Sequence, residues 1–313
     1  MGADAPGTQE ETIDADMDGG QDVEMEFVGK LEVEDSLGSL EPSVDDFVAG
    51  LLLQQLGSLG RRYRREARQG AKAIVSEVYS PPRVTKLLRE SRMRHAVPGL
   101  ALDLTVNDPM DGTPWDFSIA AKRRRARQLF AEQRPYIIIG SPECTHFCSF
   151  QAMNMARSKD VEAMKRAKTA AIVHLKFVAQ LYADQIARGK YFLHEHPLRA
   201  TSWSEDEIAK ILQRPDVIRV HGDQCQYGAE VHSGKHAGKP ILKPTGFMTN
   251  APAVARALPL TCQGTWDACS RRRGGQHQSC SGRYAREAAK YPKGLCRAML
   301  KGVRDQLKED ELI

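Results

Sequence analysis

The sequence predicts an α/β protein with a Rossmann-like sheet and helices on both of its faces. Residues 136–140 read Tyr-Ile-Ile-Ile-Gly, an apolar run typical of a strand buried on both faces. Such runs alternate along the chain with helical patterns of ten or more residues, which is the order of parallel βαβ units. No internal repeat is visible, so the alternation predicts one continuous sheet.

The predicted elements follow one another from residue 71 onward. The helix at 115–133 has two candidate capping residues, Asp116 and Ser118, whose side-chain oxygens can accept its first free amides. The helix at 157–189 carries an apolar stripe that includes Ala171, Leu175 and Val178. Strands are expected at 71–80, 99–104, 136–140, 191–197, 216–228 and 246–252, and helices at 83–94, 115–133, 157–189 and 203–215.

Charge is distributed unevenly along the 313 residues. Residues 1–46 contain fifteen Asp and Glu and one Lys, whereas the rest of the chain contains 44 Lys and Arg against 25 Asp and Glu. An acidic segment of this composition cannot bury enough apolar surface to fold alone, so a disordered tail is expected. The basic remainder suits a polyanion such as nucleic acid, with DNA favoured over RNA, although basic surfaces are often simply solvated.

We expect four parts in the chain. A disordered acidic tail at 1–46 precedes a basic helical linker at 47–70, whose arginines either contact phosphates or are solvated. A Rossmann-like domain at 71–255 is followed by a Cys- and Arg-rich loop and a closing C-terminal helix at 256–313. The sequence does not indicate an oligomeric state.

Cysteine usage and hydropathy bear on location. The seven cysteines are scattered, no secretion signal pattern is visible, and no run of eighteen apolar residues occurs. These features predict an intracellular protein that does not span a membrane. A nucleic-acid partner favours the nucleus over the cytoplasm. The segment 122–125, Lys-Arg-Arg-Arg, is either a nuclear-import patch or, slightly favoured, the solvated face of a helix.

Polar residues follow the ends of the predicted strands. In parallel sheets ligands bind beyond the carboxyl ends of the strands, and Asp103, Cys144 and Glu195 all lie at such ends. A thiol is nucleophilic as the thiolate, and a carboxyl group that donates a proton would support its addition to an electron-poor ring. The alternatives are a small packed cysteine and a surface carboxylate. The neighbours of Glu195, His194 and His196, are expected to point to the opposite face of their strand.

Two of these segments resemble the cytosine-C5 DNA methyltransferases. Ser-Pro-Glu-Cys-Thr-His-Phe-Cys-Ser-Phe at 141–150 resembles the Pro-Cys loop of that family, and Phe-Leu-His-Glu-His-Pro at 192–197 resembles its Glu-Asn-Val strand end. The layout over 71–250 is similar to a methyltransferase-like segment of eukaryotic retroelement polyproteins. The resemblance implies a class I methyltransferase sheet that binds S-adenosylmethionine. It implies that Cys144 attacks C6 of a flipped cytosine and that Glu195 contacts N3.

The same resemblance implies further site residues. Residues 75–80 correspond to the cofactor-binding first strand, Asp103 to the acidic strand end that faces the ribose, and Asp116 to a residue near the adenine. The segment 291–303 resembles the closing helix. Cofactor contacts are thus expected from Glu77, Tyr79, Ser80, Asp103, Asp116 and Asn250, and nucleic-acid contacts from Arg83, Gln224, Gln226, Arg271, Arg272 and Arg273. Lys243, Thr245 and Asn250 are expected to line the same edge of the sheet.

One departure from the family favours a different function. The first loop, residues 79–83, reads Tyr-Ser-Pro-Pro-Arg and has no glycine, where the family has a glycine-rich loop that lets the backbone approach the cofactor. The alternative is therefore a catalytically inactive nucleic-acid-binding module of a retroelement-derived protein. A third hypothesis is a cysteine hydrolase that uses Cys144 with His146 or His194, for which no orienting residue is identifiable.

A second group of chemically versatile residues lies near the C-terminus. Cys262, Cys269, His277 and Cys280 are candidate zinc ligands, but only His277 and Cys280 have the close spacing of a typical ligand pair. A polar loop with scattered residues is the favoured interpretation, so we expect no metal. The arginines at 271–273, inside this segment, suit phosphate contacts or solvation equally.

Overall fold

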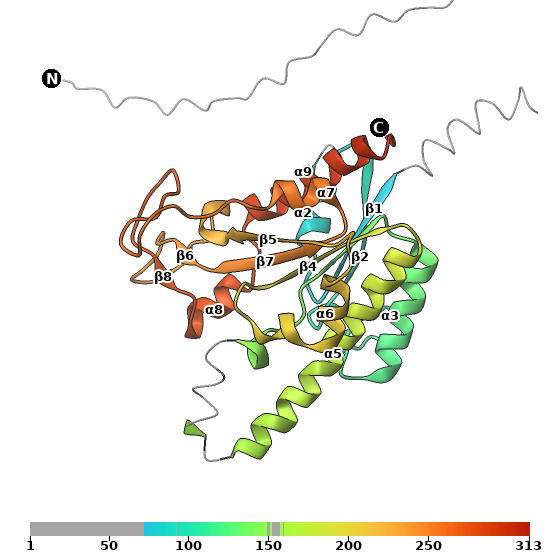
Figure 1. Ribbon diagram of the computed structural model, residues 1–313, viewed down its shortest axis with the longest axis horizontal. Helices are drawn as coiled ribbons and strands as arrows, with labels where there is room; N and C mark the ends of the chain where they lie inside the picture. The colour runs from blue at the N-terminus through green and yellow to red at the C-terminus, as the bar shows by residue number, and fades with distance from the viewer. Residues whose placement is uncertain (1–71, 92, 149–150, 152–156, 159) are drawn as a thin grey trace, which may run out of the picture. The chain divides into compact units, whose positions relative to one another are not determined.

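A computed structural model describes residues 72–91, 93–148, 151, 157–158 and 160–313 (Figure 1). The expected acidic tail at 1–46 and basic helical linker at 47–70 lie outside the described residues. The expected Rossmann-like domain and the closing segment lie almost entirely within them. No helix in the described part of the chain is both long enough and apolar enough to cross a membrane.

Six strands form the main sheet, and each corresponds to a predicted strand. Their order across the sheet is β2-β1-β3-β4-β7-β5. The first four strands are mutually parallel. The strands are β1 (Ala73–Val78), β2 (Ala96–Leu102), β3 (Ile137–Gly140), β4 (Tyr191–Pro197), β5 (Ile218–Asp223) and β7 (Pro244–Thr249).

Strand β7 departs from the parallel arrangement. It lies between β4 and β5 and is antiparallel to both, with Pro244 opposite Asp223 at the end of β5. After β5 the chain stays near that end of the sheet, because no helix of the crossover type separates β5 from β7. Parallel neighbours need a crossover connection, whereas a chain that turns back from the same end enters as an antiparallel strand. The sheet is therefore mixed but mostly parallel.

Helices cover both faces of the sheet, as predicted (Figure 1). One face carries Val75, Ile139 and Leu193, which share a buried cluster with residues of α2, α7 and α9. The other face, with Ile138 and Phe192, packs against α3, α5 and α6. The first group is α2 (Val84–Glu90), α7 (Pro252–Ala257) and α9 (Lys293–Glu309), and the second is α3 (Ala120–Gln133), α5 (Val161–Ala187) and α6 (Asp206–Leu212).

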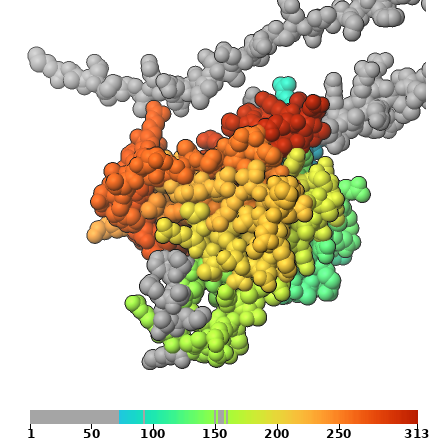
Figure 2. Space-filling view, viewed as in Figure 1, coloured from blue at the N-terminus to red at the C-terminus, as the bar shows by residue number. Residues whose placement is uncertain are grey.

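The closing helix belongs to the same core as the sheet. Leu295, Met299 and Val303 of α9 are fully buried against that first face. The expected boundary between 255 and 256 therefore divides two sequence regions that share one hydrophobic core. Two short features have no periodic sequence signal: the helix α8 (Gly282–Ala288), and the two-stranded sheet in which β6 (Ile241–Leu242), before β7, pairs with β8 (Gln278–Ser279). In Figure 2 these orange segments gather at the end of the molecule away from α3.

The segment before α3 differs from its prediction. The helix begins at Ala120, and Ile119 occupies the capping position without a side-chain hydrogen bond. Asp116 instead accepts the amide of Ser118 in a turn. Lys122 is buried and forms ion pairs with Asp108 and Asp111, so this residue is not on the solvated face expected for 122–125.

Candidate active site at the carboxyl edge of the sheet

The order of the strands indicates where this sheet would bind a ligand. Strand β2 lies on the outer side of β1, whereas β4 lies on the outer side of β3, so the connections leave β1 and β3 in opposite directions. In open α/β sheets such a switch point, beyond the carboxyl ends of the strands, is where ligands bind. Here the paired ends are Val78 and Gly140, followed by the loops 79–83 and 141–148.

Glu77 organises the loop that follows β1. Its carboxylate is fully buried and accepts hydrogen bonds from the amides of Arg83, Val84 and Thr85 at 2.7–3.2 Å. It also accepts the hydroxyls of Thr85 and Ser80. These contacts hold the first residues of α2 against the strand end, where free amides need acceptors. Glu77 and Ser80 are therefore occupied by the loop itself, and they shape the site rather than present free groups to it.

Tyr79 has the backbone conformation of a glycine. Its φ of 58° lies in the left-handed region, which side chains with a Cβ rarely adopt. Its ring lies 4.8 Å from that of Phe117, and its hydroxyl is 3.0 Å from His174 Nδ1. Burial raises the pKa of the Tyr79 hydroxyl well above its usual value, so it stays protonated. The loop keeps a glycine-like turn at the switch point without a glycine, and strain of this kind concentrates at functional sites.

A matched pair of variants tests this backbone strain. Tyr79→Gly and Tyr79→Ala both remove the ring and its hydrogen bond, but only alanine keeps the left-handed penalty. We expect Tyr79→Gly to be more stable than Tyr79→Ala by about 1 kcal/mol. Urea unfolding of the two purified variants measures the difference. Equal stabilities would show that residue 79 does not hold a left-handed conformation.

The two aspartates expected to contact the cofactor lie in the segment between β2 and α3. Asp103 follows β2 and accepts the amide and hydroxyl of Thr105. Asp116 is partly buried, and hydrogen bonds from the Ser118 side chain and amide lower the pKa of its carboxyl group. Asp116 is also close enough to influence the ionisation of Tyr79 electrostatically. The structure thus brings Asp116 near the first loop, while Asp103 lies at the end of the adjacent strand.

Asn250 lies at the other edge of the sheet. Its side chain accepts the amide of Phe192 and donates to the carbonyl of Lys190, at the start of β4. The position follows from the reversed direction of β7, which puts its C-terminal end beside the amino ends of the parallel strands. Lys243 and Thr245, at the beginning of the same segment, do lie at the carboxyl edge as expected.

Glu195 is the centre of a buried polar cluster. It is 3% exposed, and its carboxylate accepts Ser141 Oγ at 2.7 Å and Gln224 Nε2 at 3.2 Å. Lys243 Nζ lies 3.3 Å from Oε1, and the Tyr291 hydroxyl lies 3.5 Å from Oε2. Burial opposes ionisation, but Lys243 and the Ser141 hydrogen bond outweigh it and lower the pKa of Glu195. The carboxylate is therefore ionised and accepts hydrogen bonds, in contrast to the proton donor expected from the sequence.

Cys144 lies beyond the end of β3, immediately before a single 3₁₀ turn at Thr145–Phe147. Burial raises the pKa of its thiol to about 11, with Lys243 opposing the rise and Glu195 adding to it. Ser141, in the same loop, is hydrogen-bonded to Glu195 and so joins this loop to the Glu195–Lys243 pair. Among the described residues, the turn that follows Cys144 has only three residues and is too short to lower the pKa of this thiol through a substantial helix dipole.

The two histidines beside Glu195 point to the opposite face, as predicted. His194 Nδ1 lies 3.0 Å from the Tyr182 hydroxyl, and His196 Nδ1 is hydrogen-bonded to Ser202. Burial lowers the pKa of both rings, to about 4 for His196, so both are neutral at physiological pH. His194 packs against Tyr182 of α5 and Trp203, whereas the His196 ring lies 6.2 Å from that of Phe147 in the loop after β3.

Some of the residues expected to contact nucleic acid are buried or bound to other residues, and others are exposed. Gln224 is fully buried against Glu195, and Gln226 donates to the sulfurs of Cys225 and Cys269. Arg271 is bound to Glu230, whereas the next two arginines are exposed. Arg83 reaches the carbonyl of Ala289 with its guanidinium group. The exposed cations among these residues are therefore Arg272 and Arg273.

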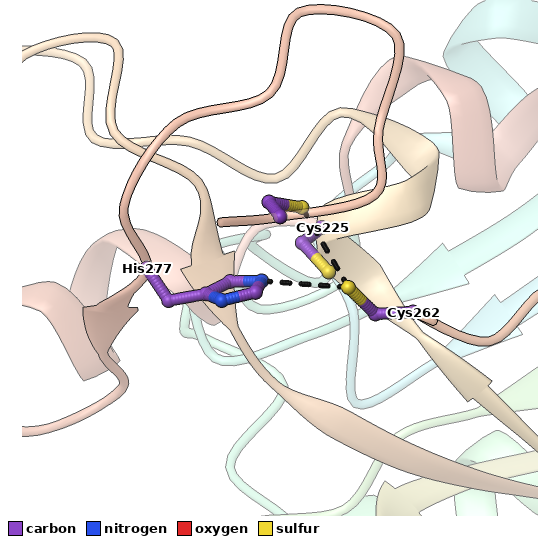
Figure 3. A group of neighbouring side chains, drawn as sticks. Cys225, Cys262 and His277 are labelled. Carbon is purple, nitrogen blue, oxygen red and sulfur yellow. Dashed lines mark hydrogen bonds between the residues drawn. The ribbon is translucent and has the colours of Figure 1, made fainter. Parts of the chain in front are cut away.

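Sequence reasoning missed several residues. Ser141 and Tyr291 complete the Glu195 cluster, and nothing in their local patterns indicates this role. The candidate zinc ligands Cys262, Cys269 and His277 do come together, but their fourth neighbour is Cys225 (Figure 3). Cys280 packs instead against apolar residues of the small sheet and α8.

No protein-family model matches the sequence, and no curated protein matches it. What the site can do therefore follows from its own residues.

Proposed function

We propose that the protein is an S-adenosylmethionine-dependent methyltransferase-like enzyme that acts on cytosine in DNA. The observation that supports this most strongly is that the loop after β3, which carries Cys144, meets the buried Glu195–Lys243 pair of the neighbouring strand through the Ser141–Glu195 hydrogen bond. These residues lie next to the topological switch point, where an α/β sheet binds its ligands. Two residues that the resemblance pairs in catalysis thus share one edge, although 50 residues separate them in sequence.

In this proposal each polar group has a distinct task. The Cys144 thiolate attacks C6 of a cytosine held out of its stack and forms a C–S bond; after C5 has received the methyl group, loss of the C5 proton to water re-forms the ring double bond and expels the thiolate. Lys243 donates a hydrogen bond to N3 of the pyrimidine ring, and the ionised Glu195 orients Lys243 through their ion pair. Gln224 Oε1 is buried and accepts no hydrogen bond among the described residues, so it offers an acceptor to an exocyclic amino group. A ring with both donors and acceptors fits this set better than a purely anionic ligand.

The cofactor would lie on the other side of the switch point. Tyr79, backed by the buried ring of Phe117, provides an aromatic surface, and Asp116 and Asp103 provide carboxylates for amino and hydroxyl groups. A bound S-adenosylmethionine supplies the methyl group as an electrophile. The chain's own residues orient it and, through the buried aromatic cluster, exclude water.

A second candidate function is a nucleic-acid-binding module without catalysis. The raised pKa of Cys144 favours it, because the thiol is mostly protonated at neutral pH. A groove between α2 and α9 favours it as well. Glu90 is the one acidic residue among the eleven that line this groove. Five of the eleven are Lys or Arg, namely Arg94, Lys293, Arg297, Lys301 and Arg304.

Calorimetric titration with S-adenosylmethionine, and with its demethylated product, separates the two functions. The first proposal expects micromolar binding that Asp103→Ala weakens at least about tenfold, since a hydrogen bond to a charged group contributes about 1.5–3 kcal/mol. Asp216→Ala is the control, because this exposed carboxylate pairs with Arg214 before β5. The absence of binding heat from folded protein would contradict the enzyme. Salt-dependent binding of DNA without cofactor would then support the module.

A further inference from the structure

Four side chains from two distant parts of the chain converge at the end of β5. Cys225 belongs to the 3₁₀ turn Gln224–Tyr227 that follows β5, and Cys262, Cys269 and His277 lie in the loop before β8. Their three sulfurs and one ring nitrogen all lie within 4.8 Å of one another (Figure 3). The Cys262 and Cys269 sulfurs are 3.8 Å apart, and His277 Nε2 is 3.6 Å from Cys262 Sγ.

These separations are those of ligands around one ion. Tetrahedral zinc binds sulfur at about 2.3 Å and imidazole nitrogen at about 2.0 Å, which places neighbouring ligand atoms between about 3.5 and 4 Å apart. A disulfide requires sulfurs about 2.05 Å apart, so the Cys262–Cys269 distance is that of separate thiols. Three sulfurs and one imidazole nitrogen form the Cys₃His set of structural zinc sites.

The imidazole ring is oriented for a metal. His277 Nδ1 lies 2.8 Å from the carbonyl oxygen of Thr265 and 3.2 Å from that of Trp266, so Nδ1 carries the proton. The lone pair is then on Nε2, the atom that faces the sulfurs. A carbonyl acceptor on the distal nitrogen is the usual support of a ligating histidine.

The surroundings of the sulfurs suit thiolates. The Ser270 amide and hydroxyl point at Cys262 Sγ at 3.5 and 3.4 Å, and Gln226 Nε2 lies 3.6 Å from the sulfurs of both Cys225 and Cys269. The backbone of the loop is fixed from the other side, because Asp223 accepts the Cys262 amide at 2.7 Å.

We propose that Cys225, Cys262, Cys269 and His277 bind one structural zinc ion. This conclusion differs from the sequence expectation of no metal, and it replaces Cys280 with Cys225 in the ligand set. All four positions are filled by protein atoms, so the site leaves no open position for catalysis. It stands independently of the proposed methyltransferase function.

The zinc ion would act as a crosslink where the hydrophobic core is thin. Residues 259–277 contain few buried apolar side chains, and Trp266 is 48% exposed. The ion would tie this loop to the turn that carries Gln224, whose side chain donates to Glu195. It would also hold the exposed Arg272 and Arg273 between two of its ligands. The metal thus supports both the polar cluster at the sheet edge and the cationic loop.

Elemental analysis of the full-length protein, purified without chelators, tests the proposal. We expect about one zinc ion per chain. Replacing zinc with Co²⁺ should give sulfur-to-metal charge-transfer absorption and the intense visible bands of tetrahedral cobalt. Cys225→Ser should lower zinc content to below about a tenth of an ion per chain, whereas Cys280→Ser should retain it. These two variants distinguish the ligand set in the structure from the one suggested by sequence spacing.

Controls keep the test decisive if a ligand variant does not fold. In the wild-type protein, modification of three thiols should release one zinc ion, and a chelator should lower the melting temperature until zinc is restored. Zinc below about a tenth of an ion per chain, both as purified and after incubation with zinc, would overturn the proposal. Unchanged zinc in a folded Cys225→Ser protein, or a Cys262–Cys269 disulfide in the reduced preparation, would overturn it as well.

Discussion

A Cys144→Ser protein is expected to lose methyl transfer to cytosine-containing DNA by at least about three orders of magnitude, because removal of a covalent nucleophile has effects of this size or larger. A hydroxyl at position 144 keeps the size of the side chain but is a much weaker nucleophile at neutral pH. Binding of S-adenosylmethionine should be nearly unchanged, since Cys144 is placed on the pyrimidine side of the switch point. The measurement is transfer of a labelled methyl group under single-turnover conditions.

Cys148→Ser is the matched control for this variant. Cys148 is also partly buried and belongs to the same loop, but the proposal gives it no chemical task. It should retain activity within a few-fold of the wild type. Equal activity of the Cys144→Ser and wild-type proteins would show that Cys144 is not the nucleophile.

The ionisation of Cys144 provides a readout that does not depend on activity. Since the pKa of the thiol is about 11, the thiolate fraction should increase about tenfold for each unit by which the pH is raised, as long as the pH stays below that value. The rate of Cys144 alkylation by iodoacetamide, followed by peptide mass spectrometry, should rise in the same way from neutral pH. A rate that is already constant above neutral pH would indicate an activated thiolate.

The sequence predicts the fold best at the apolar strands in the centre of the sheet. The isoleucines of β3 and the apolar start of β4 can only be buried strands, and β4 has the predicted bounds of 191–197. The direction of β7 could not be predicted, because it depends on the path of the chain between Asp223 and Pro244 rather than on any periodicity. Asn250 was assigned to the wrong edge for this same reason.

The polar cluster illustrates a related limit. The strand-end rule brought Cys144 and Glu195 to one edge, but whether Glu195 is ionised depends on Lys243, which arrives from another strand. Sequence spacing does not indicate Cys225 as a ligand, because it lies 37 residues before Cys262 and has no second ligand close to it in sequence. Contacts between distant segments decide both cases.

The charge state of Glu195 should depend on Lys243. In Lys243→Met the principal opposing charge is removed, and burial then raises the pKa of Glu195 above its ordinary value of 4.5. Loss of one partner of a buried ion pair leaves an uncompensated charge, so we expect a destabilisation of about 3 kcal/mol near neutral pH. Urea unfolding of the wild-type and variant proteins at a series of pH values measures it.

The sign of the pH dependence follows from proton linkage. In the wild type, the lowered pKa of Glu195 contributes stability that is present above 4.5 and is lost as pH falls through the folded-state pKa. In the variant, the raised pKa favours the protonated folded state, so stability falls by about 1.4 kcal/mol per pH unit from 4.5 up to the new pKa. The difference between the two proteins should therefore be small near pH 4.5 and grow toward neutral pH.

The double variant Lys243→Met/Glu195→Gln identifies the group responsible. It lacks both charges, so its stability relative to the wild type should no longer decrease as pH rises above 4.5. The neighbours Ser141, Gln224 and Tyr291 remain in place in both variants, and the histidines on the opposite face cancel in the comparison. A stability difference between Lys243→Met and the wild type that does not change with pH would contradict the assignment. Glu195 would then be held ionised by its hydrogen bonds alone, and Lys243 would be free to act on a bound ligand instead.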